Sequence, residues 1–503
     1  MPKEIVLENV TKTKDTVSYD LSIDDKKFKI DYRFAAVNCV LDLSKVEERF
    51  DPIVVSLMYH ALTRGYDFRS EYPISNELLY RLTYQFVPQM LRCAPKDTLH
   101  SVEIAAPLKE IEDVNDWIGL DIACDVDHLA SAYENTHVSE IPESRLTHLI
   151  HINTGARHDT LIQSEINGVR SFRERARSRL IIINSNIARM IKDAFDDPDY
   201  NLSHTFRDCG AVTVLQNFFR RFYYSTAHNL DEFSVDTSRD CSYYDRWFLP
   251  FISSNRLHFY LSDCRGMTRF QKLRFISDYQ FSYDTLHVCR QNEKHCGHCA
   301  DCRYTLVALD MLDALKRYKS VFDLDEYQKL RAEHVNYIFE HRNDDPSFKE
   351  LCMLMPDDMK HDDIVFKVST FHNTNAYFDG DAHLCHKNPV EIKGDHYPLY
   401  ARLCGDKISL FCVKDECINY INGVDNSAKP IVDQKPMPLD IIRNSDGSIS
   451  IKIGNSFLRA ARTDENLSLQ IRNGEWEHFF LRDADFTYNQ LSNLKNFLPF
   501  KES

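Results

Sequence analysis

Four closely spaced cysteines are the sequence feature that most constrains how this chain folds. They follow a C-x6-C-x2-C-x2-C pattern and are Cys289, Cys296, Cys299 and Cys302. Tetrahedral Zn²⁺ takes four thiolates, and a C-x2-C step lets one tight turn offer two of them to the same ion. We predict a closed, structural zinc site at 289–302 that anchors the start of a helix. The alternatives are four buried thiols without a metal, or the replacement of one cysteine by a neighbouring histidine, His287, His295 or His298.

Length, composition and net charge limit the classes of protein to which this chain can belong. The chain has 503 residues, of which 43% are hydrophobic, enough for several domains with ordinary cores. Its 61 Lys and Arg against 76 Asp and Glu leave a net charge of −15, which disfavours general nucleic-acid binding. The N-terminus MPKEIVLENV has no apolar signal-peptide core, and no stretch approaches the roughly 18 apolar residues of a membrane span. We expect a cytoplasmic protein that does not associate with membranes and keeps its thiols reduced.

Strand and helix patterns alternate from Trp117 to about Ile187. This alternation predicts βαβ units and a parallel sheet flanked by helices, with a ligand site at the carboxyl ends of the strands. Residues 17–33 alternate apolar and polar around Asp24-Asp25, which predicts a hairpin. The expected strands of the α/β region are 119–123, 146–152, 180–184, FFRRFYYST and RLHFYLSD, and the expected helices are a run through Leu129 and Tyr133, 163–179, and one after Cys302 with leucines at 306, 309, 312 and 315.

Glycine is scarce, and its spacing excludes several phosphate-binding motifs. The chain has 14 glycines, and the two closest, Gly447 and Gly454, are seven positions apart. The glycine-rich loops of dinucleotide-binding, P-loop and kinase folds need closer glycines, because backbone must approach phosphate there.

An internal repeat occupies the C-terminal part. Similar units begin at 366–368, 408–410 and 449–451, each followed by a second strand (376–378, 418–421, 457–460) and an apolar closing segment (397–403, 437–442, 476–481). Three copies of about forty residues with four short strands each predict a β-trefoil. The third copy resembles the fascin-type repeat, and an ordinary β-sandwich is the alternative.

Residues 30–320 resemble a family of bacterial QueC-like proteins, related to 7-cyano-7-deazaguanine synthase. The resemblance rests on the cysteine array followed by a helix and on the segments PISNELLYRLTYQF, LTHLIHINTG, RSRLIIINSNI and PFISSNRLHF. It implies the adenine nucleotide alpha-hydrolase-like (PP-loop, HUP-like) fold. The expected domains are an N-terminal hairpin with helices packing on the core (1–100), the QueC-like α/β domain (101–325), a helical connector (326–363), the trefoil (364–487) and a tail (488–503).

The family's ATP loop, S-G-G-x-D-S, falls at Ala123-Cys124-Asp125-Val126-Asp127-His128. Only Asp127 matches, so the glycines and hydroxyls that would cradle pyrophosphate at a helix N-terminus are missing. Asp125 also adds negative charge where polyphosphate would lie. Asp125 and Asp127 are candidate Mg²⁺ ligands, with acidic residues at a helix N-terminus as the simpler explanation.

Three further features complete the candidate sites. Asn153 and Gly155, at the end of the 146–152 strand, are candidate nucleotide contacts, with a plain turn as the alternative. Cys124 and His128 form a candidate nucleophile pair, against a small buried thiol and a polar helix residue. An arginine-rich helix with residues 170, 173, 175, 177 and 179 is a candidate partner or phosphate surface, against a solvated face.

Two functions follow from these features. The first is a zinc-binding QueC-like protein with a degenerate ATP loop, acting as a binding or regulatory component; it would hold a small molecule, a nucleotide or a protein partner through the trefoil or the arginine helix. The alternative is an active, Mg-ATP-dependent adenylating ligase or synthase of the QueC type. The resemblance also implies a setting in anti-phage defence or nucleobase modification.

Overall fold

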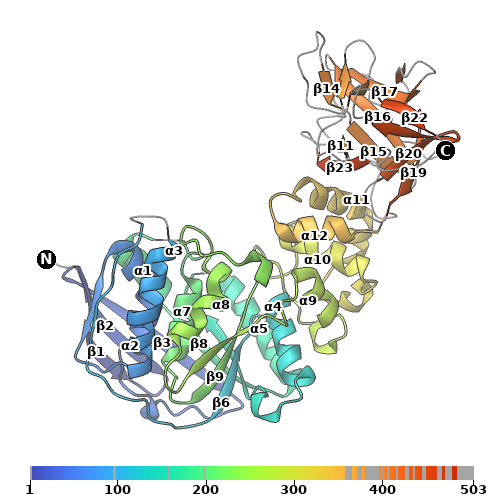
Figure 1. The fold of residues 1–503 in the computed structure, drawn as a ribbon. Helices are drawn as coiled ribbons and strands as arrows, with labels where there is room; N and C mark the ends of the chain where they lie inside the picture. Colours follow the sequence, from blue (N-terminus) through green and yellow to red (C-terminus); the bar gives the residue numbers. More distant parts are fainter. Residues whose placement is uncertain are drawn as a thin grey trace. The chain divides into compact units, whose positions relative to one another are not determined.

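The chain divides into two units, Met1–Gln328 and Lys329–Ser503, in the computed structural model shown in Figure 1. The structure describes residues 3–94, 98–156, 159–197 and 199–356, and between 365 and 483 it describes the strands given below with a few adjoining residues.

A ten-stranded mixed sheet forms the centre of the first unit, in the order β10-β9-β6-β7-β8-β3-β2-β1-β4-β5. Neighbouring strands from β10 to β8 are parallel, as the alternating pattern predicts. The strands are β1 (Glu4–Lys12), β2 (Thr16–Ile23), β3 (Lys26–Val37), β4 (Asp67–Ser70), β5 (Ile104–Ala105), β6 (Trp117–Asp121), β7 (His148–Asn153), β8 (Arg179–Ser185), β9 (Phe219–Ser225) and β10 (His258–Ser262).

Strand order reverses at β6, the first strand in the sequence of the parallel part from β10 to β8. Chain order proceeds from β6 through β7 to β8 on one side, and β9 and β10 pair on the other. In open α/β sheets a crevice forms at the carboxyl ends of the strands where the order reverses. The topology thus marks the carboxyl end of β6 as the place for a site.

The predicted hairpin is confirmed and extends this sheet. Asp24 and Asp25 adopt positive φ angles of 48° and 61°, as the tight turn between β2 and β3 requires. Strand β3 pairs antiparallel with β8, from Tyr32 opposite Ser185 to Val37 opposite Leu180. The sheet of this unit is therefore mixed, because the hairpin covers the edge that β8 would otherwise leave unpaired.

Helices and short turns connect the strands of this unit. The helices are α1 (Asp51–Arg64), α2 (Asn76–Arg81), α3 (Val87–Cys93), α4 (Val126–Tyr133), α5 (Asp159–Ala176), α6 (Ile187–Phe195), α7 (His204–Thr213), α8 (Asp245–Phe248), α9 (Arg269–Ile276) and α10 (Ala300–Met311). The short turns are η1 (Leu43–Lys45), η2 (Leu82–Phe86), η3 (Glu134–Val138), η4 (Pro142–Ser144), η5 (Leu230–Glu232), η6 (Cys241–Tyr244), η7 (Leu249–Ile252), η8 (Gln280–Ser282) and η9 (Leu315–Tyr318). Helix α11 (Leu324–Glu340) crosses the boundary between the units.

Two helices end earlier than their apolar and charged patterns predict. Helix α5 ends at Ala176, because Arg177 adopts a positive φ of 50° that an α-helix does not allow. The helix after Cys302 ends at Met311, and Asp313 has φ 51°, so Leu315 belongs to the separate turn η9. The helical residue pattern of the sequence continues through Arg177 and Asp313, but the backbone leaves the helical conformation there.

Helices α1 and α7 pack against each other at a close approach (Figure 1). A Cβ atom added at Gly210 of α7 would lie 1.9 Å from the Ser56 hydroxyl oxygen and 2.9 Å from the Pro52 carbonyl oxygen of α1. Ser56 also contacts the Tyr32 hydroxyl at 3.1 Å. Only glycine allows the two backbones this contact.

In its described residues, the second unit contains α12 (Pro346–Leu354) and thirteen short strands. The strands are β11 (Val365–Thr370), β12 (Tyr377–Asp379), β13 (Leu384–Cys385), β14 (His396–Pro398), β15 (Tyr400–Cys404), β16 (Lys407–Lys414), β17 (Cys417–Val424), β18 (Pro430–Asp433), β19 (Leu439–Arg443), β20 (Ile449–Ile453), β21 (Ser456–Ala460), β22 (Leu467–Gln470) and β23 (Phe479–Asp483). Every pairing among them is antiparallel.

Strand pairing in this unit repeats three times. The strands that begin the three sequence units, β11, β16 and β20, each pair with the closing strand of their own copy and with that of the neighbouring copy. These six pairings join β11, β15, β16, β19, β20 and β23 into a continuous ring. Parts of the predicted segments lie outside the described residues, namely 357–363 of the connector, Ala376, 476–478 and the tail 488–503.

The contact at Gly210 generates a stability prediction. We expect Gly210→Ala to lower the free energy of unfolding by about 1–3 kcal/mol, because the added methyl group overpacks the α1–α7 contact. Gly168→Ala is the matched control: it lies within α5, and its Cβ would meet no atom within 4 Å. Urea denaturation should show the control unchanged or stabilised by up to about 1 kcal/mol. Equal effects of the two substitutions would contradict the close approach.

Candidate functional site

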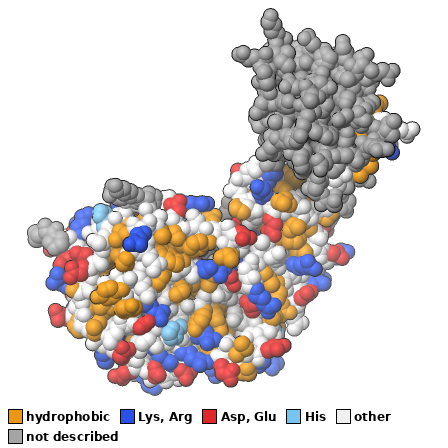
Figure 2. Space-filling view, viewed as in Figure 1, with side chains coloured by type: hydrophobic (Ala, Val, Ile, Leu, Met, Phe, Trp, Pro, Cys, Tyr) orange, Lys and Arg blue, Asp and Glu red, His pale blue; other side chains and the backbone are white. Residues whose placement is uncertain are grey.

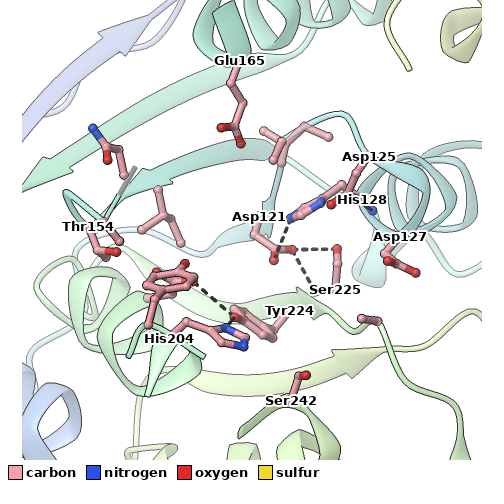
Figure 3. A pocket seen from close by; sticks show the side chains of 18 of the residues that line it. Asp121, Asp125, Asp127, His128, Thr154, Glu165, His204, Tyr224, Ser225 and Ser242 are labelled. Atoms are coloured by element: carbon pink, nitrogen blue, oxygen red, sulfur yellow. Dashed lines mark hydrogen bonds and ion pairs between the residues drawn. The ribbon is translucent and has the colours of Figure 1, made fainter. Parts of the chain in front are cut away.

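A pocket opens at the carboxyl ends of β6, β7 and β9, where the strand order reverses (Figure 3). Its open volume, which includes solvent space at the mouth, is about 1040 Å³. Seven acidic side chains line it against one arginine: Asp121, Asp125, Asp127, Glu165, Asp208, Asp240, Asp245 and Arg290. The pocket therefore has a strongly negative character.

The loop between β6 and α4 holds the residues that the resemblance aligns with an ATP loop. Cys124 has a positive φ of 64°, in a position where glycine would be unstrained. Asp125 is the N-cap residue of α4, and its carboxylate accepts a hydrogen bond of 3.0 Å from the backbone N–H of His128. A side chain of this protein thus takes up one of the amides that a phosphate would use at a helix N-terminus.

His128 lies between two carboxylates (Figure 3). Its Nδ1 is 2.6 Å from Asp125 Oδ1, and its Nε2 is 3.4 Å from Asp121 Oδ2. Burial alone would lower the pKa of His128 and raise that of Asp125, but the opposite charges outweigh burial, so the His128 pKa is well above and the Asp125 pKa below its usual value. Asp121 also accepts hydrogen bonds from the Ser225 N–H and hydroxyl, at 2.9 and 2.8 Å.

Asp127 lines the pocket and forms an ion pair with Lys272 of α9. The Lys272 ammonium nitrogen is 2.7 Å from Asp127 Oδ1, and its side chain is 1% exposed. Burial opposes its charge, but the Asp127 carboxylate outweighs burial and raises the pKa of Lys272. Asp127 is therefore already paired with an internal cation.

Of the other two predicted nucleotide contacts, the structure places one in the pocket. Asn153 lines it, and its side chain donates to Asn184 Oδ1 and accepts from the Gly155 N–H, both at 3.0 Å. Gly155 is not among the lining residues; it has φ 81°, and a Cβ there would lie 2.7 Å from the Ser185 carbonyl oxygen. Gly155 thus serves the turn after β7.

The predicted Cys124–His128 nucleophile pair is disfavoured. Cys124 is 1% exposed, and burial, together with the charges of Glu165 and Asp125, raises the pKa of its thiol well above the usual value. His128 contacts carboxylates on both ring nitrogens. Cys124 is better described by the alternative interpretation, a small buried thiol without a catalytic role.

Sequence reasoning missed the opposite wall of the pocket, which includes His204, Tyr224, Asp240 and Asp245. Tyr224 lies near the end of a predicted strand. The expectation of a ligand site at the carboxyl ends of the strands therefore pointed to its neighbourhood. His204 and Asp240 are 36 positions apart and contact each other at 2.9 Å. No local spacing in the sequence signals that contact.

The four predicted cysteines come together as a group. Their sulfur atoms all lie within 4.8 Å of one another, and Cys296 and Cys302 are 4.0 Å apart. Sulfurs tetrahedrally bound to one zinc ion lie about 3.8 Å apart, so the group has the size of a metal site. Gly297, with φ 74°, allows the turn in which the N–H groups of His298 and Cys299 donate to Cys296 at 3.4 and 3.3 Å.

The neighbouring histidines have other contacts. The His295 ring accepts from the Val288 N–H at 3.0 Å and contacts the Val321 carbonyl at 2.9 Å. His287 contacts the Glu293 carbonyl at 3.2 Å, and His298 lies 3.5 Å from Glu326. All four positions of the group are cysteines, which fits a closed structural site.

The cysteine group supports the pocket through the chain that leads into it. The His287 N–H donates to the carbonyl of Cys124 at 2.9 Å, which joins the segment before Cys289 to the loop after β6. Arg290, next to Cys289, lines the pocket and lies 3.7 Å from Asp301. The segment that carries the cysteine group is thus hydrogen-bonded to the loop after β6 and contributes Arg290 to the lining.

The arginines predicted to share one helix are divided between elements. Arg179 belongs to β8, Arg177 ends the helix, and Arg175 of α5 forms an ion pair with Asp284. On the face in Figure 2, basic and acidic side chains alternate over the first unit without a continuous basic stripe. The five arginines therefore do not lie on a single helix, because only Arg170, Arg173 and Arg175 belong to α5.

No model of a known protein family matches this sequence, and a search of curated proteins found no match. Within the part of the chain that the structure describes, no helix combines the length and apolar character needed to cross a bilayer.

The Asp127–Lys272 pair generates a second stability prediction. We expect Asp127→Ala to lower the free energy of unfolding by about 3–5 kcal/mol in urea at neutral pH, because it leaves a buried ammonium group uncompensated. Asp193→Ala is the control: it removes the exposed Arg189–Asp193 pair and should cost less than about 1 kcal/mol. Similar losses in the two variants would show that Lys272 is solvated.

The His128 ion pairs predict a pH dependence. Because the His128 pKa is raised in the folded protein, its stabilisation is complete below the ordinary value of 6.5 and is lost as pH rises through the raised pKa. The stability difference between wild type and His128→Gln should therefore be largest below pH about 6.5, shrink steadily above that pH and vanish above the raised pKa. Urea titrations from pH about 6 to about 10 measure it. A difference that has already vanished at neutral pH would refute the doubly paired imidazolium.

Proposed function

We propose that this chain is a zinc-binding, QueC-like protein that works as a binding or regulatory component and does not use ATP. Within this proposal the first unit has the PP-loop fold and the four cysteines hold structural zinc. The Asp125 carboxylate occupies the helix N-terminus at which the loop of an active enzyme would bind phosphate. A role in anti-phage defence or nucleobase modification belongs to the same proposal and rests on the resemblance to QueC-like proteins.

The observation that carries the proposal is that a side chain of the protein already caps the N-terminus of α4. There the Asp125 carboxylate accepts the hydrogen bond of the His128 N–H, and it also pairs with the His128 ring. A phosphate at this position would have to displace the carboxylate or lie beside it. Two like charges about 4 Å apart cost on the order of 4 kcal/mol at an effective dielectric constant of 20.

The remaining charge of the pocket supports the same conclusion. Asp127, the family's matching acidic residue, is neutralised by Lys272 instead of being open to Mg²⁺. The lining has a single arginine, Arg290, whose side chain is 74% exposed. An acidic lining of this kind favours a cationic ligand, or a ligand that brings its own metal, over a bare polyphosphate.

Zinc in the cysteine group would supply rigidity. Four thiolates close the coordination sphere, so no position is left for a catalytic water. The neighbouring thiol of Cys302 lowers the pKa of Cys299 to about 5, which makes a thiolate available at neutral pH. Through the His287–Cys124 hydrogen bond, the ordered group would hold the β6–α4 loop in place.

For the second unit we propose a β-trefoil that serves as a recognition module for a protein partner. Support comes from the three-fold pairing, in which each copy's first strand joins two closing strands and completes a ring of six. Fold alone names no ligand, so the partner follows from the resemblance to fascin-type repeats.

Calorimetric titration of the zinc-loaded protein with Mg-ATP tests the proposal. We expect no saturable heat up to millimolar nucleotide, because the α4 N-terminus is capped and the lining is acidic. Asp125→Asn is the informative variant, since asparagine keeps the cap and removes the charge. Asp127→Ala is unsuitable, because it leaves Lys272 unpaired.

Saturable micromolar binding of Mg-ATP by the wild-type protein would overturn the proposal. If Asp125→Asn abolished that binding, Asp125 would be a Mg²⁺ ligand and the adenylating-enzyme alternative would replace the binding role. Pyrophosphate release with candidate carboxylates would then be the activity to measure.

A further inference from the structure

A second cluster of metal-ligating side chains lies at the pocket, apart from the four-cysteine group. It consists of His204, Asp240 and Cys241, whose ligand atoms all lie within 4.8 Å of one another. His204 Nε2 is 2.9 Å from Asp240 Oδ1. Nitrogen, carboxylate oxygen and thiolate sulfur are all ligands of zinc, and a thiolate in the set favours zinc over magnesium or calcium.

The starts of two helical segments bring these residues together. His204 is the first residue of α7. Asp240 caps η6, accepting from the N–H and the hydroxyl of Ser242 at 2.9 and 2.6 Å. The N–H of Cys241 donates to the Asn201 carbonyl at 2.9 Å, which ties η6 to the segment before α7.

Hydrogen bonds behind His204 select the tautomer that a metal requires (Figure 3). The Tyr224 hydroxyl donates to Asp208 Oδ2 at 3.3 Å, so its oxygen is the acceptor for His204 Nδ1, 3.4 Å away. Nδ1 then carries a proton, and a second proton lies between Nε2 and Asp240 Oδ1, where a metal ion would replace it. Metal-binding histidines are oriented in this way by a partner on their second nitrogen.

A backbone N–H group points at the Cys241 sulfur, as in the four-cysteine group. Its side chain is fully buried, and the Thr205 N–H points at the sulfur atom at 3.5 Å. In the four-cysteine group, the Cys299 N–H points in the same way at the Cys296 sulfur, 3.3 Å away. Backbone N–H groups aimed at sulfur stabilise a thiolate ligand.

A buried carboxylate provides an independent sign of a missing cation. Asp245 lines the same pocket and is 1% exposed, and neither of its oxygens has a hydrogen-bond partner among the described residues. Burial raises the pKa of Asp245 to about 7, which the charge of His204 and the Thr205 side chain offset only in part. A nearby metal cation would favour the charged form of Asp245, and the described residues that line this wall include no lysine or arginine.

We propose that His204, Asp240 and Cys241 form a second zinc site, with three protein ligands and an open fourth position. His204 and Asp240 line the pocket and Cys241 lies behind them, so the open position faces the ligand space. It takes water or an anionic oxygen of a bound molecule, such as a carboxylate or a phosphate. Binding replaces the proton shared by His204 and Asp240 with the ion. This site stands whether or not the pocket binds ATP.

Zinc stoichiometry tests the site. After saturation with Zn²⁺ and removal of the excess on a desalting column, mass spectrometry of the metal should give about two ions per chain, one in each cluster. Asp240→Asn should retain about one, because asparagine preserves the η6 cap but is a weak zinc ligand. Cys296→Ser is the reciprocal variant, since it disturbs the four-cysteine group and leaves the second cluster intact.

Two controls make the result decisive. Circular dichroism shows whether each variant is folded, and Tyr224→Phe, which removes only the hydroxyl behind His204, should weaken the second equivalent about 10–100-fold without changing the first. One ion in the saturated wild-type protein would overturn the site. Two ions in Asp240→Asn, or an unchanged second affinity in Tyr224→Phe, would also overturn it.

Discussion

Parallel pairing of β6 with both β7 and β9 is the constraint on which the rest of the structure depends. Because β6 is the first strand of the parallel part from β10 to β8 and lies between its successors, the loops after β6 and β9 diverge and leave a crevice at their carboxyl ends. Asp121 and Ser225, at the ends of those two strands, join across it through two hydrogen bonds.

Within that crevice, internal ion pairs occupy the places where a nucleotide-binding protein keeps free donors. Asp125 binds the α4 N-terminus and His128, and Asp127 binds Lys272. These contacts stabilise the fold and also remove the groups that would bind Mg-ATP, which links the stability of the site to its proposed loss of ATP use. The opposite wall keeps ligating side chains in contact, which is where the proposed metal site lies.

Features encoded by short-range patterns were predictable. The hairpin at Asp24-Asp25, the buried strand β8 and the cysteine group each follow from spacing within a few residues, and the strands of the C-terminal repeat lie at the predicted segments. Helix ends at Ala176 and Met311 were missed, because a positive φ at Arg177 or Asp313 leaves no trace in the hydrophobic period. The arginine pattern failed for the same reason, since Arg179 had already entered β8.

The sequence by itself determined the four thiols of one metal-sized group, the parallel strands and the loss of a glycine-rich phosphate loop, because each depends on residue types at near-neighbour spacing. Only the tertiary structure decided that Asp127 pairs with Lys272, 145 positions away, and that His204 meets Asp240. Such contacts arise when strand order and helix packing bring distant segments together. Their energies depend on burial and on the distance between charges, which residue order does not record.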